Sequence, residues 1–255
     1  MEAEFTEFSY GFALSFEIVQ SFQMVTLGAP RFPSLLDEGR TGGYDVDFTL
    51  VGWPLFLQFK RTEFISRATG YEWLSYGEPY YRMSIRPRKK SSQHAMLKNY
   101  ATREPDVYYV APCFWKMSEF DDHFVSQSVF QNSMFFNLRQ VPSLPDDKKH
   151  YITFLPNTTG FIWHSDNAER FTSSIMGSQL FSSIREHRPE PVVINAGYLL
   201  RLRRNLTDII LEHNTHNQTR ASDFRGANDP LAKVVSDIRH LLATYFELQM
   251  FVIPG

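Results

Sequence analysis

The feature that most constrains the fold of this chain is an apolar segment interrupted by a few polar residues, GYDVDFTLVGWPLFLQFKRTE. Side chains two positions apart on a strand point to the same face. Asp45 and Asp47 therefore share a face of one strand, and Gln58 and Lys60 share a face of the next. The intervening VGWP is typical of a tight turn. We expect a β-hairpin in which the two polar pairs converge.

Helices and strands are expected to alternate around this hairpin. Phe8, Phe12, Phe16 and Val19 recur at helical spacing and predict a first helix. Further strands are predicted at YYRMSIRP, DVYYVAPCF, HYITFLP and GFIWHSD. Further helices are predicted at SSQHAMLKNYATRE and INAGYLLRLRRNLTDIILEHN. A last helix is predicted from Pro230 to Phe246, with Asp229 as its N-cap. Irregular structure is expected at 115–145, and loops at SIREHRPEP and THNQTRASDFRGAND. The order of elements indicates an α/β core.

The length of the chain fits one domain with elaborations. Its 255 residues are 43% hydrophobic and include 23 Phe, which is ample material for a large core. We expect a single domain over 1–255, with a core at 8–114, an insertion with additional strands at 115–166 and a helical part at 167–255.

Composition excludes several classes of protein. A net charge of −2 argues against a uniformly basic nucleic-acid coat, although a local basic groove is compatible with it. The single cysteine, Cys113, excludes an internal disulfide framework and a cysteine-rich zinc site. The acidic start MEAEFTEF is unlike a signal peptide, and no apolar run approaches the roughly 20 residues of a membrane span. We expect a cytoplasmic protein that does not contact membranes.

The polar residues of the expected hairpin suit metal-dependent chemistry. An Asp carboxylate and a Gln amide carbonyl are hard oxygen ligands that can hold Mg²⁺. A lysine ammonium beside the ion can position a water and offset charge on a phosphate. Asp45, Gln58 and Lys60 would supply these groups.

The spacing of these residues resembles the PD-(D/E)XK nucleases. G-Y-D, 12 residues and then Q-F-K is similar to the D…QxK motif of the Mrr-like branch. The resemblance covers about 8–114 and implies a restriction-endonuclease-like fold, a central mixed sheet flanked by helices, to which the chain would add C-terminal helices. It implies metal binding by Asp45 and Gln58 and a catalytic role for Lys60. Because Gln replaces the usual acid, an additional carboxylate matters more, and Glu38 or Glu17 is the candidate.

A basic segment follows the third predicted strand. SIRPRKKSSQH precedes a predicted helix, and phosphate contacts use basic side chains, hydroxyl groups and helix N-termini. The candidates for nucleic-acid contact are Arg86, Arg88, Lys89, Lys90, Ser92, Gln93 and His94. A second group, Arg201, Arg203 and Arg204 in RLRRNL, would contact nucleic acid or an acidic patch of a partner.

These observations predict a nuclease that hydrolyses DNA phosphodiester bonds with Mg²⁺ or Mn²⁺. By analogy with Mrr-like nucleases, we expect an effector subunit of a prokaryotic antiviral defence or restriction system, acting as a homodimer or with a regulatory sensor protein. The alternative is a non-catalytic subunit that keeps the nuclease fold to bind nucleic acid or protein. Gln58 favours this alternative, whereas Asp45 and Lys60 argue against it.

Overall fold

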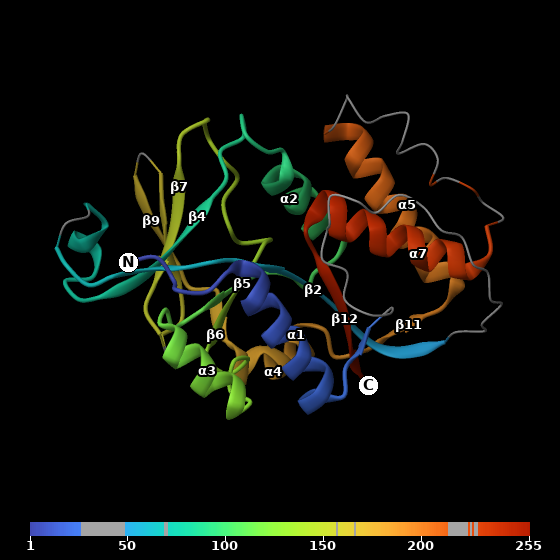
Figure 1. The fold of residues 1–255 in the computed structure, drawn as a ribbon. Helices are drawn as coiled ribbons and strands as arrows, with labels where there is room; N and C mark the ends of the chain where they lie inside the picture. The colour runs from blue at the N-terminus through green and yellow to red at the C-terminus, as the bar shows by residue number, and fades with distance from the viewer. Residues whose placement is uncertain are drawn as a thin grey trace.

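The computed structural model describes residues 1–26, 49–68, 71–156, 158–165, 167–213, 224, 226 and 229–255. In this part of the chain two β-sheets are flanked by helices, which is an α/β architecture (Figure 1). The helices are α1 (Glu7–Phe22), η1 (Tyr71–Ser75, a 3₁₀ turn), α2 (Gln93–Arg103), α3 (Met117–Val125), α4 (Gly177–His187), α5 (Ala196–His213), α7 (Leu231–Leu241) and the π-helical turn η3 (Leu242–Phe246).

The larger sheet is mixed and runs in the order β1-β12-β2-β5-β6-β10, with β11 also paired to β2. Strand β2 is parallel to β5 and antiparallel to β12 and β11. Helix α2 lies in the connection between the parallel strands β2 and β5. The strands are β1 (Val25–Thr26), β2 (Leu50–Phe59), β5 (Val107–Pro112), β6 (Ser133–Asn137), β10 (Ser174–Met176), β11 (Val192–Ile194) and β12 (Gln249–Pro254).

The smaller sheet is antiparallel, in the order β3-β4-β7-β8-β9. Its strands are β3 (Glu63–Ile65), β4 (Tyr80–Ile85), β7 (His150–Phe154), β8 (Phe161–His164) and β9 (Ala168–Phe171). The predicted pair of strands at HYITFLP and GFIWHSD is confirmed as β7 and β8, and YYRMSIRP as β4.

Two hydrophobic cores cover the two faces of the larger sheet. Leu55 and Leu57 of β2 belong to the core shared with α1, α3 and α4. Phe56, which lies between them in the sequence, belongs to the core shared with α2, α5, α7 and the smaller sheet. The two groups of helices accordingly lie on opposite sides of β2 and β12 (Figure 1). Gln58 and Lys60 continue the alternation of Phe56, so they face the side of α2.

The predicted turn at VGWP is wrong, because these residues lie within β2. A Cβ on Gly52 would lie 2.3 Å from the carbonyl oxygen of Ile253, so glycine here permits the close approach of β12. On the other edge of β2, Pro54 lies between Gly52, which pairs with β11, and Phe56, the first residue paired with β5. The missing N–H of Pro54 therefore interrupts no ladder hydrogen bond.

Other predictions need correction after residue 115. The segment 115–145 contains helix α3 and strand β6, which belongs to the larger sheet. Residues of SIREHRPEP extend helix α4 to His187. The predicted last helix becomes α7 and η3, and the apolar tail after it forms β12 beside β2. In the described residues of 167–255, four strands thus accompany the helices. THNQTRASDFRGAND falls almost entirely outside the described residues.

Several helices and strands confirm the sequence patterns. Helices α1, α2 and α5 lie where they were predicted, and all six residues of β5 are buried. The stripe of Phe8, Phe12, Phe16 and Val19 is nevertheless the solvent-facing side of α1, since each of these side chains is at least 41% exposed. Among the described helices, none is both long and apolar enough to cross a bilayer.

Candidate active site

Of the predicted catalytic residues, two lie outside the described residues, and a third lies away from the end of β2. Asp45 and Glu38 fall in 27–48, outside the described residues. Glu17 lies on α1 and is 3% exposed, on the opposite side of the larger sheet from Gln58. Its Oε2 accepts a hydrogen bond of 3.1 Å from the backbone N–H of Phe130. Burial raises the pKa of the Glu17 carboxyl group. Glu17 therefore fastens α1 to the segment before β6.

Gln58 lies near the end of β2 with a side chain that is 1% exposed. Its Nε2 donates hydrogen bonds to the carbonyl oxygen of Phe246 at 3.3 Å and to Glu247 Oε2 at 3.4 Å. Its Oε1 is buried and has no hydrogen-bond partner within the described residues. A buried acceptor without a partner is costly, and such an atom indicates a place where a ligand or ion can bind.

Lys60 follows directly after β2 and is only 6% exposed. Its backbone N–H donates to the carbonyl of Val110 at 2.8 Å, which continues the β2–β5 pairing. Its ammonium group lies 5.3 Å from the centre of the Tyr109 ring. Burial lowers the pKa of Lys60, and the carboxylates of Glu7 and Glu247 only partly oppose this effect. The structure thus holds this amine in a confined position next to Gln58.

Glu247 is an acid of this site that sequence reasoning missed. It follows the π-helical turn η3 and precedes β12, with φ of 51°, in the left-handed region that non-glycine residues seldom adopt. Burial raises the pKa of its carboxyl group, but the Gln93 side chain, Lys60 and Arg86 together hold it below its usual value. Irregular helices and left-handed residues both recur at functional sites. A local pattern could not reveal Glu247, because only the pairing of β12 with β2 places it here.

The segment 86–94 divides between this site, the surface and the core. Arg86 donates to Glu247 Oε1 at 2.9 Å, and its side chain is 55% exposed, so it lies at the edge of the site. Gln93, at the start of α2, is buried and donates to the carbonyl of Phe246 at 3.3 Å. The structure therefore brings Gln58, Lys60, Arg86 and Gln93 together around Glu247.

The remaining residues of this segment form no ion pair with Glu247 among the described residues. Arg88 and Lys89 are exposed, each within 4 Å of Asp147, and Lys90 is exposed. Ser92 precedes α2 without a side-chain cap.

His94 is a core residue and not a surface contact. It is 4% exposed, and its ring nitrogens interact with the Tyr109 hydroxyl at 2.7 Å and the Pro142 carbonyl at 2.8 Å. Burial lowers the pKa of His94 to about 4, so the ring is neutral at physiological pH. His94 fixes Tyr109, the ring next to Lys60.

The described residues at this site include two oxygen donors of the kind that a hard divalent cation takes, and Gln58 turns its Nε2, not its Oε1, toward Glu247. The free Gln58 Oε1 and the Glu247 carboxylate are oxygen ligands of the kind that Mg²⁺ takes, with water completing its shell. Within the described residues there is no group of three or more His, Cys, Asp or Glu side chains that could hold a metal. A metal here would accordingly use an amide oxygen and one described carboxylate.

Comparison with known proteins gives no relative: no family model, curated protein or solved structure matches this chain.

Proposed function

We propose that this protein is a metal-dependent nuclease of the PD-(D/E)XK type that hydrolyses DNA phosphodiester bonds. The observation that carries the proposal is the position of Gln58 and Lys60 at the end of a buried central strand, with Glu247 and the unpaired Gln58 Oε1 beside them. A parallel pair β2–β5, with α2 in its connection and helices on both faces, is compatible with the restriction-endonuclease-like fold.

In this proposal Gln58 and Glu247 hold the metal. Asp45 and Glu38, the acids predicted from the sequence as further ligands, lie outside the described residues and stay predictions. A bound Mg²⁺ or Mn²⁺ would supply a Lewis acid and a water of lowered pKa. Lys60 places its ammonium where negative charge develops on the phosphate and stabilises that charge in a site largely closed to solvent. Arg86, at the exposed edge, binds an adjacent phosphate of the strand.

Arg88, Lys89 and Lys90 extend the phosphate-binding surface away from the metal. Their contribution to DNA affinity would fall as salt concentration rises, because exposed cations act through counterion release. We further propose, by analogy with Mrr-like nucleases, that the protein is an effector in prokaryotic antiviral defence or restriction, regulated as a homodimer or by a sensor protein. Unregulated cleavage by the isolated chain would remove the reason for a sensor partner.

The test is cleavage of supercoiled and linear DNA with Mg²⁺ or Mn²⁺. Lys60→Met keeps an unbranched side chain of similar length and removes the charge, and Glu247→Gln keeps the shape and removes the negative charge. Each should reduce the cleavage rate by about a hundredfold or more. Lys149→Met and Glu212→Gln, at exposed positions, are the matched controls and should cleave as the wild type does.

Circular dichroism should show that all four variants are folded. Wild-type protein that binds DNA but cuts none with either metal would contradict the nuclease proposal and favour a non-catalytic DNA-binding subunit. Equal rates for wild type and Lys60→Met would exclude Lys60 from the reaction.

A further inference from the structure

A recess of about 630 Å³ lies at the other end of the larger sheet from Lys60. It is formed by the end of α2, the start of α5 and strand β11. Val192 of β11 pairs with Gly52 at the start of β2, whereas Gln58 lies six residues further along that strand. At roughly 3.3 Å per residue, the β11 wall of the recess lies about 20 Å along β2 from Gln58. The recess and the candidate active site are therefore separate sites.

Arginine is the dominant residue type around the recess. Four arginines and a single acid, Glu104, line it: Arg103, Arg188, Arg201 and Arg204. Arg188 contacts Asp106 at 3.4 Å, and Arg103 contacts Glu212 at 3.5 Å. For Arg201 and Arg204, by contrast, the described part of the chain holds no acidic partner within salt-bridge distance. Within the described residues, two guanidinium groups of the recess, those of Arg201 and Arg204, thus have no carboxylate bound to them.

The sequence RLRRNL explains why these two cations share a side. Arg201 and Arg204 are three residues apart on α5 and so lie on the same face of the helix. Arg203 lies on a different face, is 3% exposed and binds Asp229 and Asp237 at 2.7 and 2.8 Å. Packing therefore uses Arg203, whereas Arg201 and Arg204 form no ion pair within the described residues.

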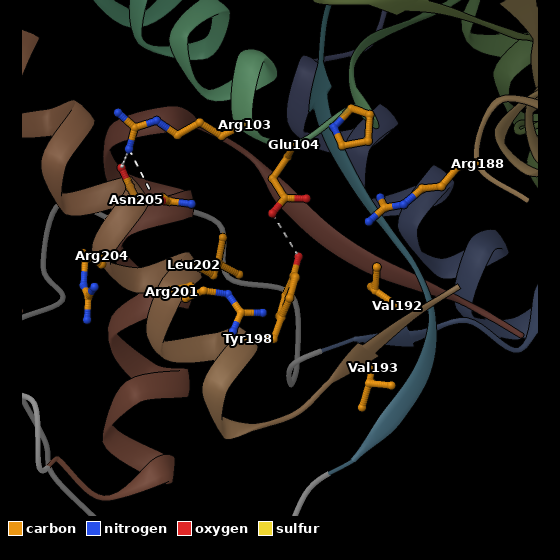
Figure 2. Close-up of a pocket in the computed structure, with 11 residues that line it drawn as sticks. Arg103, Glu104, Arg188, Val192, Val193, Tyr198, Arg201, Leu202, Arg204 and Asn205 are labelled. Atoms are coloured by element: carbon orange, nitrogen blue, oxygen red, sulfur yellow. Dashed lines mark hydrogen bonds between the residues drawn. The ribbon is translucent and has the colours of Figure 1, made fainter. Parts of the chain in front are cut away.

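The remaining wall of the recess is aromatic and apolar. Tyr198 is 7% exposed, and its hydroxyl donates to Glu104 Oε1 at 3.4 Å (Figure 2). Val192 and Leu202 lie to either side of this tyrosine in the same view. Glu104 is itself largely buried, and a carboxyl group in this position can accept hydrogen bonds from N–H groups of a ligand. A flat, nitrogen-containing ring suits such a wall.

We propose that this recess binds a nucleotide, with its phosphates on Arg201 and Arg204 and its base against Tyr198 and Glu104. Arginine matches phosphate oxygens with paired N–H donors, and the Glu104 carboxylate can accept hydrogen bonds from the N–H groups of a base. The volume lies within the roughly 300–1,000 Å³ of small-molecule sites. Arg188, whose guanidinium faces Glu104 in Figure 2, supplies a further cation at the base end. This site is independent of any nuclease activity.

The proposal is tested by isothermal titration calorimetry on the full chain without divalent metal, using ATP, AMP, pyrophosphate and a short duplex DNA as probes. ATP should bind more tightly than pyrophosphate, because the base adds contacts. The Arg201→Ala/Arg204→Ala variant should bind ATP at least about tenfold more weakly, since one charge-assisted hydrogen bond is worth about that factor or more in affinity. Both residues are exposed, so the variant should fold.

Two control variants complete the experiment. Arg67→Ala removes an exposed arginine outside the recess, and Lys60→Met changes the candidate active site; both should bind ATP as the wild type does. Absence of ATP binding by the wild type, or equal affinity in the double variant, would overturn the proposal. If duplex DNA alone binds, and the double variant loses it, the recess is a nucleic-acid contact and the nucleotide proposal is also wrong.

Discussion

Gln58 on β2 donates a hydrogen bond of 3.4 Å to the carboxylate of Glu247, a residue 189 positions later in the chain. The contact exists because β12 pairs antiparallel with β2, with Gln249 opposite Leu57. The C-terminal strand thus completes the site that the QFK segment begins. Truncation before Glu247 would remove a central strand and an acid of the site together.

Because the backbone of Glu247 is left-handed, substitutions at this residue that abolish the same function should differ in stability. Ala keeps the backbone strain of φ 51°, whereas Gly adopts this conformation without it. Glu247→Gly should therefore be more stable than Glu247→Ala by about 1 kcal/mol in urea unfolding. Both should lose the DNA cleavage that we propose, because both lack the carboxylate.

Gln127, with φ of 52° after α3, is the matched control for this comparison. Gln127→Gly should also have a free energy of unfolding about 1 kcal/mol higher than that of Gln127→Ala, but neither variant should change the rate of DNA cleavage. If Glu247→Gly were no more stable than Glu247→Ala, strain at this residue would be excluded.

Glu17 predicts a pH dependence of stability. Burial raises the pKa of its carboxyl group above the usual 4.5, so the folded protein keeps this proton at a pH where the unfolded chain has released it. Wild-type stability should fall, relative to Glu17→Gln, as pH rises from the usual value through the raised one. Urea unfolding of both proteins at about pH 4.5 and about pH 7.5 measures this difference. If the difference in free energy of unfolding between the two proteins were the same at both pH values, the pKa of Glu17 would not be raised in the folded protein.

Much of the fold follows from local patterns, whereas long-range pairing does not. The apolar runs at β4, β5, β7 and β8 predict strands because burial imposes that composition over a few residues. The turn prediction at VGWP is wrong, because Gly and Pro mark turns in general but here lie within β2. Here Gly52 permits close strand packing, and Pro54 occupies a gap between two partner strands.

The same distinction holds for the candidate site. Gln58 and Lys60 could be predicted because both lie in one short motif on one strand. Glu247 could not, since its proximity depends on where a strand near the C-terminus pairs. The resemblance to PD-(D/E)XK nucleases makes Glu17 a candidate ligand, yet its side chain accepts a hydrogen bond from the backbone of Phe130. An acid in an amphipathic helix reveals its face only after the helix is packed.

Gly52 predicts a large cost for a small change. Gly52→Ala would place a methyl group 2.3 Å from the Ile253 carbonyl oxygen and force β2 and β12 apart. The free energy of unfolding should fall by about 1–3 kcal/mol. Gly197→Ala, in the first turn of α5, meets only side-chain atoms, Asn195 Oδ1 at 3.3 Å and Arg201 Nη1 at 3.6 Å, and should change stability by about 0.5 kcal/mol or less. Equal effects in urea unfolding would contradict the assigned β2–β12 packing.

Arg203 and Arg204 are neighbours in RLRRNL and carry the same charge, but only Arg203 is buried. Substituting each of them separates the effect of burial on stability from the effect of charge. Arg203→Ala leaves Asp237, which is 8% exposed, without its strongest partner. We expect the free energy of unfolding to fall by about 3 kcal/mol, which is the lower end of the range for breaking a buried ion pair. The lower end applies because Lys233 still contacts the Asp237 carboxylate at 3.2 Å. Arg204→Ala, next in the sequence but exposed, should stay within about 0.5 kcal/mol of wild type. Urea unfolding of both variants would contradict the packing of α5 on α7 if Arg204→Ala were the more damaging change.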